Sequence, residues 1–229
     1  MVHPDPAMDV HAVIFDLDGT LLNTLEDISN SANGFLEIHG FPTHESDDYR
    51  AFIGNGVEKL IMRALPKESR DGDTISVGVA QFRRIYRQNC NIHTKPYDGV
   101  PNMLDELVAR GLKLAVLSNK PDEFTKQCVG NLLSDCAFDM VLGHHRDIPP
   151  KPDPAGALHI GERIGVPPES ILLVGDSGVD METAVSAHMV PVGARWGFRS
   201  VEELRTGGAK VVVDHPREIV SLLGGQPKG

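Results

Sequence analysis

Near its N-terminus the chain carries a short aliphatic run that ends in two acids, Val13-Ile14-Phe15-Asp16-Leu17-Asp18-Gly19-Thr20. Such a run predicts a buried strand, and the glycine marks the turn that follows it. Asp16 and Asp18 are two positions apart, so in extended backbone both carboxylates point to the same side. Two buried like charges are costly unless a cation lies beside them. The pattern therefore indicates a divalent-metal site with a nucleophile next to an acid/base residue.

This run is also typical of two other structures, a simple turn and a calcium-binding loop. Asp and Gly are ordinary turn residues, so a strand followed by a simple turn stays open at this point. A calcium-binding EF-hand loop is excluded by spacing, because its fifth, sixth and twelfth positions hold Thr20, Leu21 and Asp27.

Composition limits the class of protein. At 229 residues the chain suits one large domain or two modest ones, and its formal net charge of −10 argues against nucleic acid and anionic membranes as partners. No apolar stretch reaches the about 18 residues of a membrane-spanning helix, and residues 1–9 show no hydrophobic signal region. An odd number of cysteines without metal-ligand spacing favours a reduced, cytoplasmic setting (Cys90, Cys128 and Cys136).

The hydrophobic pattern changes twice along the chain. From about residue 23 to 95 apolar residues recur three and four positions apart without a convincing strand, and Thr24 with Asp27 resembles a helix-capping signal. Elsewhere short aliphatic runs alternate with helical patterns. Further strands are expected at 112–117, 138–142, 171–174, 190–192 and 211–213, and helices from Pro101 and at 122–132, 154–164, 178–187 and 216–223.

Alternating strands and helices predict an α/β fold, a Rossmann-like, mostly parallel sheet covered by helices on both faces. The first strand must join this sheet, so the helical segment is an insertion. We expect a catalytic core formed by residues 1–22 and 96–229 and an all-helical cap domain formed by residues 23–95.

Polar residues follow several of the predicted strands. In such a sheet, ligands bind beyond the carboxyl ends of the strands. The first run ends in the two acids, the run at 112–117 ends in Ser118-Asn119-Lys120, and the run at 171–174 ends in Gly175-Asp176-Ser177-Gly178-Val179-Asp180. A separate loop carries Lys151 between prolines. Together these residues place acids, a hydroxyl and a cation on one rim.

With these four elements in this order, the chain resembles the phosphatase branch of the haloacid dehalogenase superfamily, and the helical insertion resembles its type-one cap. The resemblance implies that Asp16 attacks phosphorus to form an aspartyl phosphate. It implies that Asp18 protonates the leaving oxygen and then activates water. It also implies that Ser118, with Asn119 beside it, binds a phosphoryl oxygen, and that Lys151 shields the charge.

The resemblance also implies a cofactor, Mg²⁺. Its ligands would be the carboxylates of Asp16 and Asp176 and the main-chain carbonyl of Asp18, with Asp180 in the outer shell. Gly19 and Thr20 are expected to offer backbone N–H groups to the phosphoryl oxygens. Taken without the family pattern, Lys151 would be a solvated loop residue, Ser118 a turn or capping residue and Asp180 a first-turn helix acid.

The reaction and substrate class follow from further details. Dehalogenases lack the second acid, nothing marks a cap lysine as a Schiff-base former, and Thr20 stands where sugar-phosphate mutases commonly carry valine. The segment Phe52–Val57 and the segment Arg195–Phe198 look like those of phosphoglycolate phosphatases. The cap residues expected to approach or bind substrate are Arg50, Gly54, Asn55 and Gly56, with Arg63 as a further candidate for a substrate carboxylate.

The leading hypothesis is a Mg²⁺-dependent phosphomonoester hydrolase acting on 2-phosphoglycolate or a similar small anionic phosphate ester, as a monomer or homodimer. The alternatives are a related hydrolase of pyrophosphate, a nucleotide monophosphate or a sugar phosphate, and a non-catalytic phosphate-binding protein. The two chain crossings near Leu22–Thr24 and Thr94–Gly99 are expected to act as cap hinges.

Overall fold

The computed structural model describes residues 9–223, and within them six parallel strands form one sheet in the order β5-β4-β1-β6-β7-β8. Strand β1 lies in the middle and pairs with β4 on one side and β6 on the other. The chain therefore reverses its direction of winding at β1, the position where sheets of this kind bind ligands. The strands are β1 (Ala12–Phe15), β4 (Lys113–Pro121), β5 (Met140–His144), β6 (Ile171–Gly175), β7 (Val190–Ala194) and β8 (Val211–Val213).

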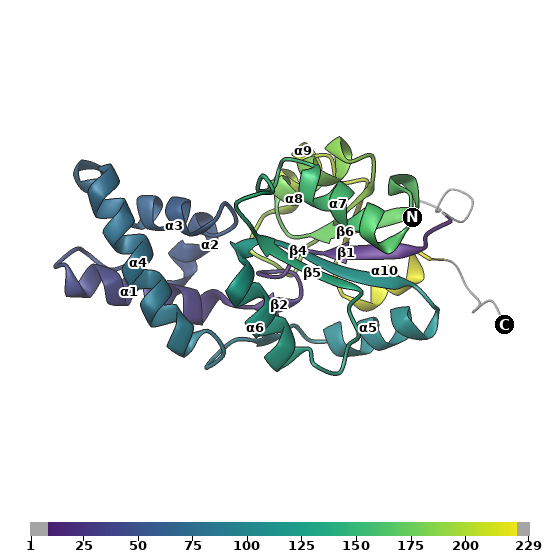
Figure 1. The fold of residues 1–229 in the computed structure, drawn as a ribbon, viewed down its shortest axis with the longest axis horizontal. Coiled ribbons are helices and arrows are strands. Elements are labelled where there is room, and N and C mark those ends of the chain that lie inside the picture. The colour runs from purple at the N-terminus through teal and green to yellow at the C-terminus, as the bar shows by residue number, and fades with distance from the viewer. Residues whose placement is uncertain (1–8, 224–229) are drawn as a thin grey trace.

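Alternate residues of β1 pack on opposite faces of the sheet, as extended backbone requires. Val13 and Phe15 belong to one buried apolar cluster, and Ala12 and Ile14 belong to another. Figure 1 shows helices on both faces. The first face is covered by α5 (Val100–Ala109), α6 (Asp122–Leu132) and α10 (Arg217–Ser221), and the second by α7 (Ala155–Ile164) and α8 (Gly178–Ser186), beside which lies α9 (Val201–Thr206).

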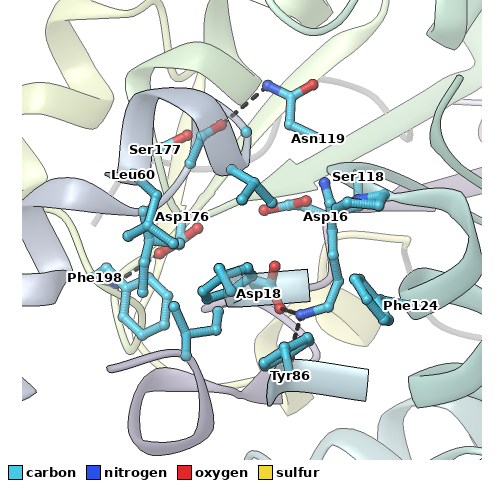
Figure 2. A pocket seen from close by; sticks show the side chains of 18 of the residues that line it. Asp16, Asp18, Leu60, Tyr86, Ser118, Asn119, Phe124, Asp176, Ser177 and Phe198 are labelled. Carbon is cyan, nitrogen blue, oxygen red and sulfur yellow. Dashed lines mark hydrogen bonds and ion pairs between the residues drawn. The ribbon is translucent and has the colours of Figure 1, made fainter. Parts of the chain in front are cut away.

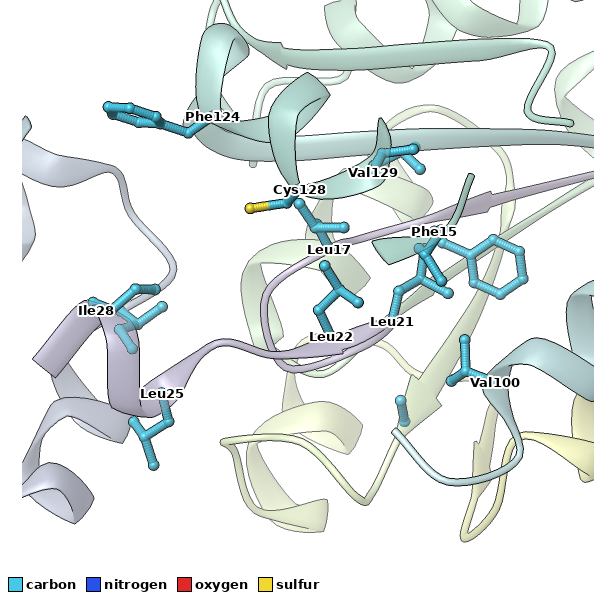
Figure 3. Packing of buried hydrophobic residues seen from close by; sticks show 14 of the residues in the cluster. Phe15, Leu17, Leu21, Leu22, Leu25, Ile28, Val100, Phe124, Cys128 and Val129 are labelled. Atoms are coloured by element: carbon cyan, nitrogen blue, oxygen red, sulfur yellow. The ribbon is translucent and has the colours of Figure 1, made fainter. Parts of the chain in front are cut away.

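The segment between β1 and α5 forms a separate group of helices at the carboxyl end of the sheet (Figure 1). Helix α1 and helix α3 both pack against α4. The apolar cluster of the first sheet face continues through Leu17, Leu21 and Leu22 into Leu25 and Ile28 (Figure 3), so the two groups share one core. The helices are α1 (Leu25–Ile38), α2 (Tyr49–Phe52), α3 (Val57–Ala64) and α4 (Gly72–Asn89), with short 3₁₀ turns at Ser46–Asp48 and Lys67–Ser69; a third such turn, Pro168–Ser170, precedes β6.

The structure confirms the predicted fold class, an α/β core with an inserted helical cap. The proposed residue limits of the two domains, at 22/23 and 95/96, stay a prediction. The strand expected at 112–117 continues to Pro121, so that Ser118 lies within it, and α9 was not expected. No described helix is both long and apolar enough to cross a membrane.

The two chain crossings between core and cap are tied to each other, which the sequence did not indicate. β2 (Leu22–Asn23) and β3 (Lys95–Pro96) form a short antiparallel pair. The predicted capping role of Thr24 and Asp27 is wrong, because the Thr24 hydroxyl makes no capping hydrogen bond. The buried Asp27 carboxylate instead accepts hydrogen bonds from the second crossing.

Those bonds come from the backbone N–H of His93 at 3.0 Å, the N–H of Thr94 at 2.9 Å and the Thr94 hydroxyl at 2.6 Å. We expect Asp27→Ala to lower the free energy of unfolding by about 3 kcal/mol, because it leaves buried donors without an acceptor. Urea unfolding measures this. The matched control Glu37→Ala, an exposed acid on the same helix, should stay within about 0.5 kcal/mol of wild type. Equal effects of the two changes would show that the crossing does not depend on Asp27.

Candidate active site

Three acids from distant parts of the chain meet at the carboxyl end of the sheet. Asp16 follows β1, Asp176 follows the neighbouring β6, and Asp180 lies in the first turn of α8. One carboxylate oxygen of each lies within 4.8 Å of the others, and all three residues are buried. The structure thus brings together the acids that the sequence analysis selected, and Figure 2 shows Asp16 and Asp176 at the edge of the same cavity.

Lys151 provides the cation of this cluster. Its Nζ lies 2.8 Å from Asp16 Oδ1, 2.6 Å from Asp180 Oδ1 and 2.9 Å from the carbonyl oxygen of Leu117. Its side chain is 4% exposed although the residue comes from a proline-rich loop. The backbone N–H of Lys151 donates to Asn119 Oδ1 at 2.8 Å, which fixes the loop to the end of β4.

The charges of this cluster are not balanced. Burial raises the pKa of Asp16 from 3.8 to about 7, with further contributions from Asp180 and Asp18 and an opposing one from Lys151. Burial, with Asp16 and Asp180 nearby, also raises the pKa of Asp176 well above its usual value. Burial by itself would lower the pKa of Lys151, but the two carboxylates outweigh it and raise that pKa. One ammonium group faces three carboxylates, so the cluster favours additional positive charge.

The donor atoms fit Mg²⁺. Both oxygens of Asp180 are used, since Oδ1 accepts from Lys151 and Oδ2 accepts from the N–H and the hydroxyl of Ser177. Asp16 Oδ2 and Asp176 Oδ1 have no recorded hydrogen-bond partner within residues 9–223. Two unpaired carboxylate oxygens in an under-compensated acidic cluster are the donors that Mg²⁺ prefers. Asp180 is arranged to orient Lys151 and the start of α8, which agrees with an outer position.

The raised pKa of Asp16 gives the metal-free protein a defined pH dependence. Between about pH 4 and pH 7 the folded protein retains a proton on Asp16 that the unfolded chain releases. The folded state binds more protons in this window, so the contribution of this group to the free energy of unfolding falls as pH rises, by up to about 1.4 kcal/mol per unit. In EDTA, urea unfolding should show Asp16→Asn becoming progressively more stable relative to wild type from pH 4 to 7. A difference independent of pH would contradict the buried, proton-holding state of Asp16.

A cavity of about 50 Å³ lies between these acids and the cap. Asp16, Asp18, Ser118 and Asp176 line its core side (Figure 2). The rest of the wall is mainly apolar and comes largely from the cap, with Ile28, Ile53, Val57, Leu60, Phe82 and Tyr86 there and Phe124 and Phe198 from the core. The site is therefore polar where the acids lie and apolar where a leaving group would extend.

The predicted glycine loop of the cap lies over the site. Gly54 and Gly56 both line the cavity, with φ values of 113° and 84° that favour glycine. The Asn119 amide donates to the carbonyl oxygens of Gly54 and Lys151, each at 3.0 Å. Because its Oδ1 accepts from Lys151 as well, the whole Asn119 amide is used in joining cap, loop and strand. Asn119 also lines the cavity, so substrate binding by this residue stays a prediction beside its positioning role.

The structure does not bring Arg50 and Asn55 to the cavity. The Arg50 guanidinium donates to Asp47 at 3.0 Å and to the Gly197 carbonyl oxygen at 3.3 Å. Asn55 Oδ1 accepts from Arg63 at 2.8 Å. Arg63 also donates to the carbonyl oxygen of Phe52 and so supports the loop. Substrate binding by Arg50 and Asn55 stays a prediction that this arrangement does not support.

The structure does not support the prediction that Gly19 and Thr20 offer N–H groups to a phosphoryl group. The Gly19 N–H donates to the Leu22 carbonyl oxygen at 2.9 Å, and the Thr20 N–H donates to that of Leu17 at 3.3 Å. Both N–H donors are therefore used in hydrogen bonds within the turn. The N–H groups of Leu17 and Asp18, two positions earlier, donate to no acceptor among the described residues. Gly19 is required instead by close packing, since a Cβ there would lie 2.3 Å from Asp176 Oδ2.

Two basic residues at the site were not anticipated. Lys120 donates to Asp18 and to Tyr86, and Arg199 donates to backbone carbonyls of Arg50 and Ile53 on the cap. The sequence contains a signal for Lys120, which lies two positions after Ser118. In a strand that continues this far, the two side chains point to the same side. Arg199 had none, because its partners are main-chain atoms about 150 positions away.

Comparisons with known proteins match most of this chain. The model of the haloacid dehalogenase-like hydrolase family matches residues 13–194. The phosphoglycolate phosphatase of Aquifex aeolicus is 31% identical over 214 residues (93% of this chain, 97% of the relative), and that of Thiobacillus denitrificans is 35% identical over 205 residues (86% and 89%). The N-acetylmuramic acid 6-phosphate phosphatase of Pseudomonas aeruginosa is 30% identical over 218 residues (94% and 96%).

A solved structure supports the same conclusion. A protein of Lactobacillus delbrueckii subsp. bulgaricus, for which phosphoglycolate phosphatase activity is inferred, superposes with a TM-score of 0.88 at 30% identity, covering 94% of this chain and 99% of that one. With the acids, the lysine and the cap in place, the chain belongs to the haloacid dehalogenase-like hydrolase family.

Proposed function

We propose that this protein is a Mg²⁺-dependent phosphomonoester hydrolase that acts on 2-phosphoglycolate or a similarly small phosphate ester. The observation that carries the proposal is the state of Asp16. One of its carboxylate oxygens is fixed by Lys151, the other has no recorded partner among the described residues, and the residue lines the cavity together with Asp18. A fixed carboxylate with a free oxygen, next to a second acid, is the arrangement that nucleophilic phosphoryl transfer requires.

The proposed reaction has two steps. An Asp16 oxygen attacks phosphorus, the bond from phosphorus to the leaving oxygen breaks, and Asp18 gives that oxygen a proton. Asp18 then takes a proton from water, whose oxygen displaces Asp16 and releases inorganic phosphate. Ser118 donates to a phosphoryl oxygen, and Lys151 keeps Asp16 oriented and offsets its charge.

The metal belongs beside the same carboxylates. Asp16 and Asp176 would hold it together with the main-chain carbonyl of Asp18, and Asp180 would lie in the outer shell. When bound, Mg²⁺ supplies the positive charge that lets an anionic nucleophile approach an anionic phosphoryl group. The unpaired oxygens of Asp16 and Asp176 support this assignment.

The relatives that match most of this chain guide the choice of substrate. One of them, an N-acetylmuramic acid 6-phosphate phosphatase, keeps a sugar phosphate as the alternative. A non-catalytic phosphate-binding role is disfavoured because both acids and Lys151 are present and oriented. Named relatives act as phosphoglycolate phosphatases, which supports this choice of substrate.

The test is release of inorganic phosphate from a panel of esters, with 2-phosphoglycolate, p-nitrophenyl phosphate, a sugar phosphate and a nucleotide monophosphate. We expect turnover with Mg²⁺, none in EDTA, and the highest kcat/KM for 2-phosphoglycolate. Asp16→Asn, purified in the same way, reports contaminating phosphatase. Turnover that persists unchanged in Asp16→Asn, or none in the wild type, would refute the proposal.

A further inference from the structure

Beside the cavity, three polar side chains form a buried chain from the core to the cap. Lys120 Nζ lies 2.7 Å from Asp18 Oδ1 and 2.7 Å from the Tyr86 hydroxyl oxygen. The Lys120 side chain is 4% exposed, and Tyr86 is 1% exposed. The ammonium group also lies 4.7 Å from the centre of the Tyr86 ring. Figure 2 shows Asp18 and Tyr86 near each other along one side of the site.

This chain determines how Asp18 is oriented. Its Oδ1 accepts from Lys120, while no partner is recorded for its Oδ2 within the described residues. A carboxylate with one oxygen fixed has a defined plane, and its other oxygen is left for proton transfer. Among the described residues, Lys120 is the only side chain that bonds to the Asp18 carboxylate. The orientation of Asp18 therefore depends on this contact.

Lys120 is poorly placed to act on substrate directly. It lines the cavity, but its ammonium group already contacts a carboxylate, a hydroxyl and an aromatic face. Lys151, by contrast, contacts Asp16 and Asp180 and makes no recorded contact with Asp18. Each of the two buried lysines thus contacts a different acid: Lys151 contacts Asp16, and Lys120 contacts Asp18.

We propose that Lys120 is the positioning residue of Asp18, and that Tyr86 completes the arrangement from the cap. Tyr86 belongs to α4, whereas Asp18 and Lys120 belong to the core. The complete chain therefore exists only where the cap lies on the core, so that Asp18 is held for proton transfer when the site is covered. The inference rests on the proposed function, because it assumes that Asp18 protonates the leaving oxygen.

The test compares two substrates that differ in their need for a proton. p-Nitrophenolate leaves readily without one, whereas phenolate, a more basic leaving group of similar size, depends more on an acid. The measured quantity is kcat/KM, which reports the steps up to the first irreversible one, here transfer to Asp16, and excludes hydrolysis of the intermediate. The ratio of kcat/KM for phenyl phosphate to that for p-nitrophenyl phosphate then reports proton donation.

In Lys120→Met this ratio should fall about tenfold or more relative to wild type, since general-acid catalysis is worth about 10²–10⁴-fold. Tyr86→Phe keeps the ring and removes the hydroxyl, so the ratio should fall about two- to fivefold, as expected for one lost hydrogen bond. The matched control Lys126→Met, whose side chain is 60% exposed and pairs with Asp122 on α6, should leave the ratio unchanged.

Because the ratio is taken on one preparation, a variant that is only partly folded gives the same value as a fully folded one. If Lys120→Met gives no folded protein, Tyr86→Phe decides alone. An unchanged ratio in the folded variants overturns the inference. So does an effect confined to the KM for 2-phosphoglycolate, which would make Lys120 a reader of the substrate carboxylate. Failure of the proposed function is distinct, because the wild type itself would then show no Asp16-dependent turnover.

Discussion

Asp16→Asn should reduce kcat by more than about 10⁴-fold, with little change in substrate binding. The substitution keeps the shape of the side chain and removes the anionic oxygen that attacks phosphorus. Lys151 and the Ser118 hydroxyl remain in place, so the phosphate is still held. Loss of turnover without loss of binding is the signature of a nucleophile and separates this role from a merely structural one.

The measurement combines steady-state phosphate release with mass spectrometry of acid-quenched enzyme. Wild type mixed with substrate should carry one phosphoryl group on the peptide that contains Asp16, and the variant should carry none. Asp135→Asn, a change at an exposed acid, serves as the control and should retain wild-type kcat. A phosphorylated peptide that lacks Asp16 would assign the nucleophile elsewhere.

Lys151→Met should reduce kcat by about 10³-fold and also destabilise the protein. Its ammonium lies within 2.8 Å of Asp16 and within 2.6 Å of Asp180, both buried. Removing it leaves two carboxylates close together without a cation. The free energy of unfolding measured in EDTA should fall by about 3–5 kcal/mol, the usual cost of breaking a buried ion pair from one side.

Mg²⁺ makes this prediction specific. Because the metal supplies positive charge at the same carboxylates, saturating Mg²⁺ should restore part of the lost stability but not the lost kcat. Lys113→Met is the control, since Lys113 forms a half-exposed ion pair with Asp139 at 3.5 Å and should change stability by less than about 1 kcal/mol. A Lys151→Met protein as stable as wild type in EDTA would mean that the acid cluster does not need this cation.

Local pattern was sufficient for the architecture and for most of the site. An aliphatic run that alternates with amphipathic segments can be buried only in a parallel sheet with two covered faces, so the α/β core and the helical insertion could be predicted. The acids of the site could be predicted for a related reason. Residues that directly follow parallel strands meet at one edge of the sheet. Asp16, Asp18 and Asp176 were therefore expected to lie close together.

The predictions that the structure does not support share a physical cause: other groups compete for each of these side chains and N–H groups. The N–H groups of Gly19 and Thr20 are consumed by their own turn. Asp27 has the spacing of a helix cap, but its carboxylate accepts hydrogen bonds from Thr94 and His93, 67 and 66 positions away. Arg50 has the chemistry to bind a carboxylate, yet Asp47 and a core carbonyl hold it outside the cavity.

The sequence by itself determined which groups are available: two acids after the first strand, a third after a neighbouring strand, and a lysine in a loop. Only the tertiary structure decided which group each of them contacts. In the folded chain Lys151 pairs with Asp16 and Lys120 pairs with Asp18, and Tyr86 of the cap bonds to Lys120. The reason is that strand order fixes where backbone ends meet, whereas ion pairs and hydrogen bonds depend on the packing of helices that are distant in sequence.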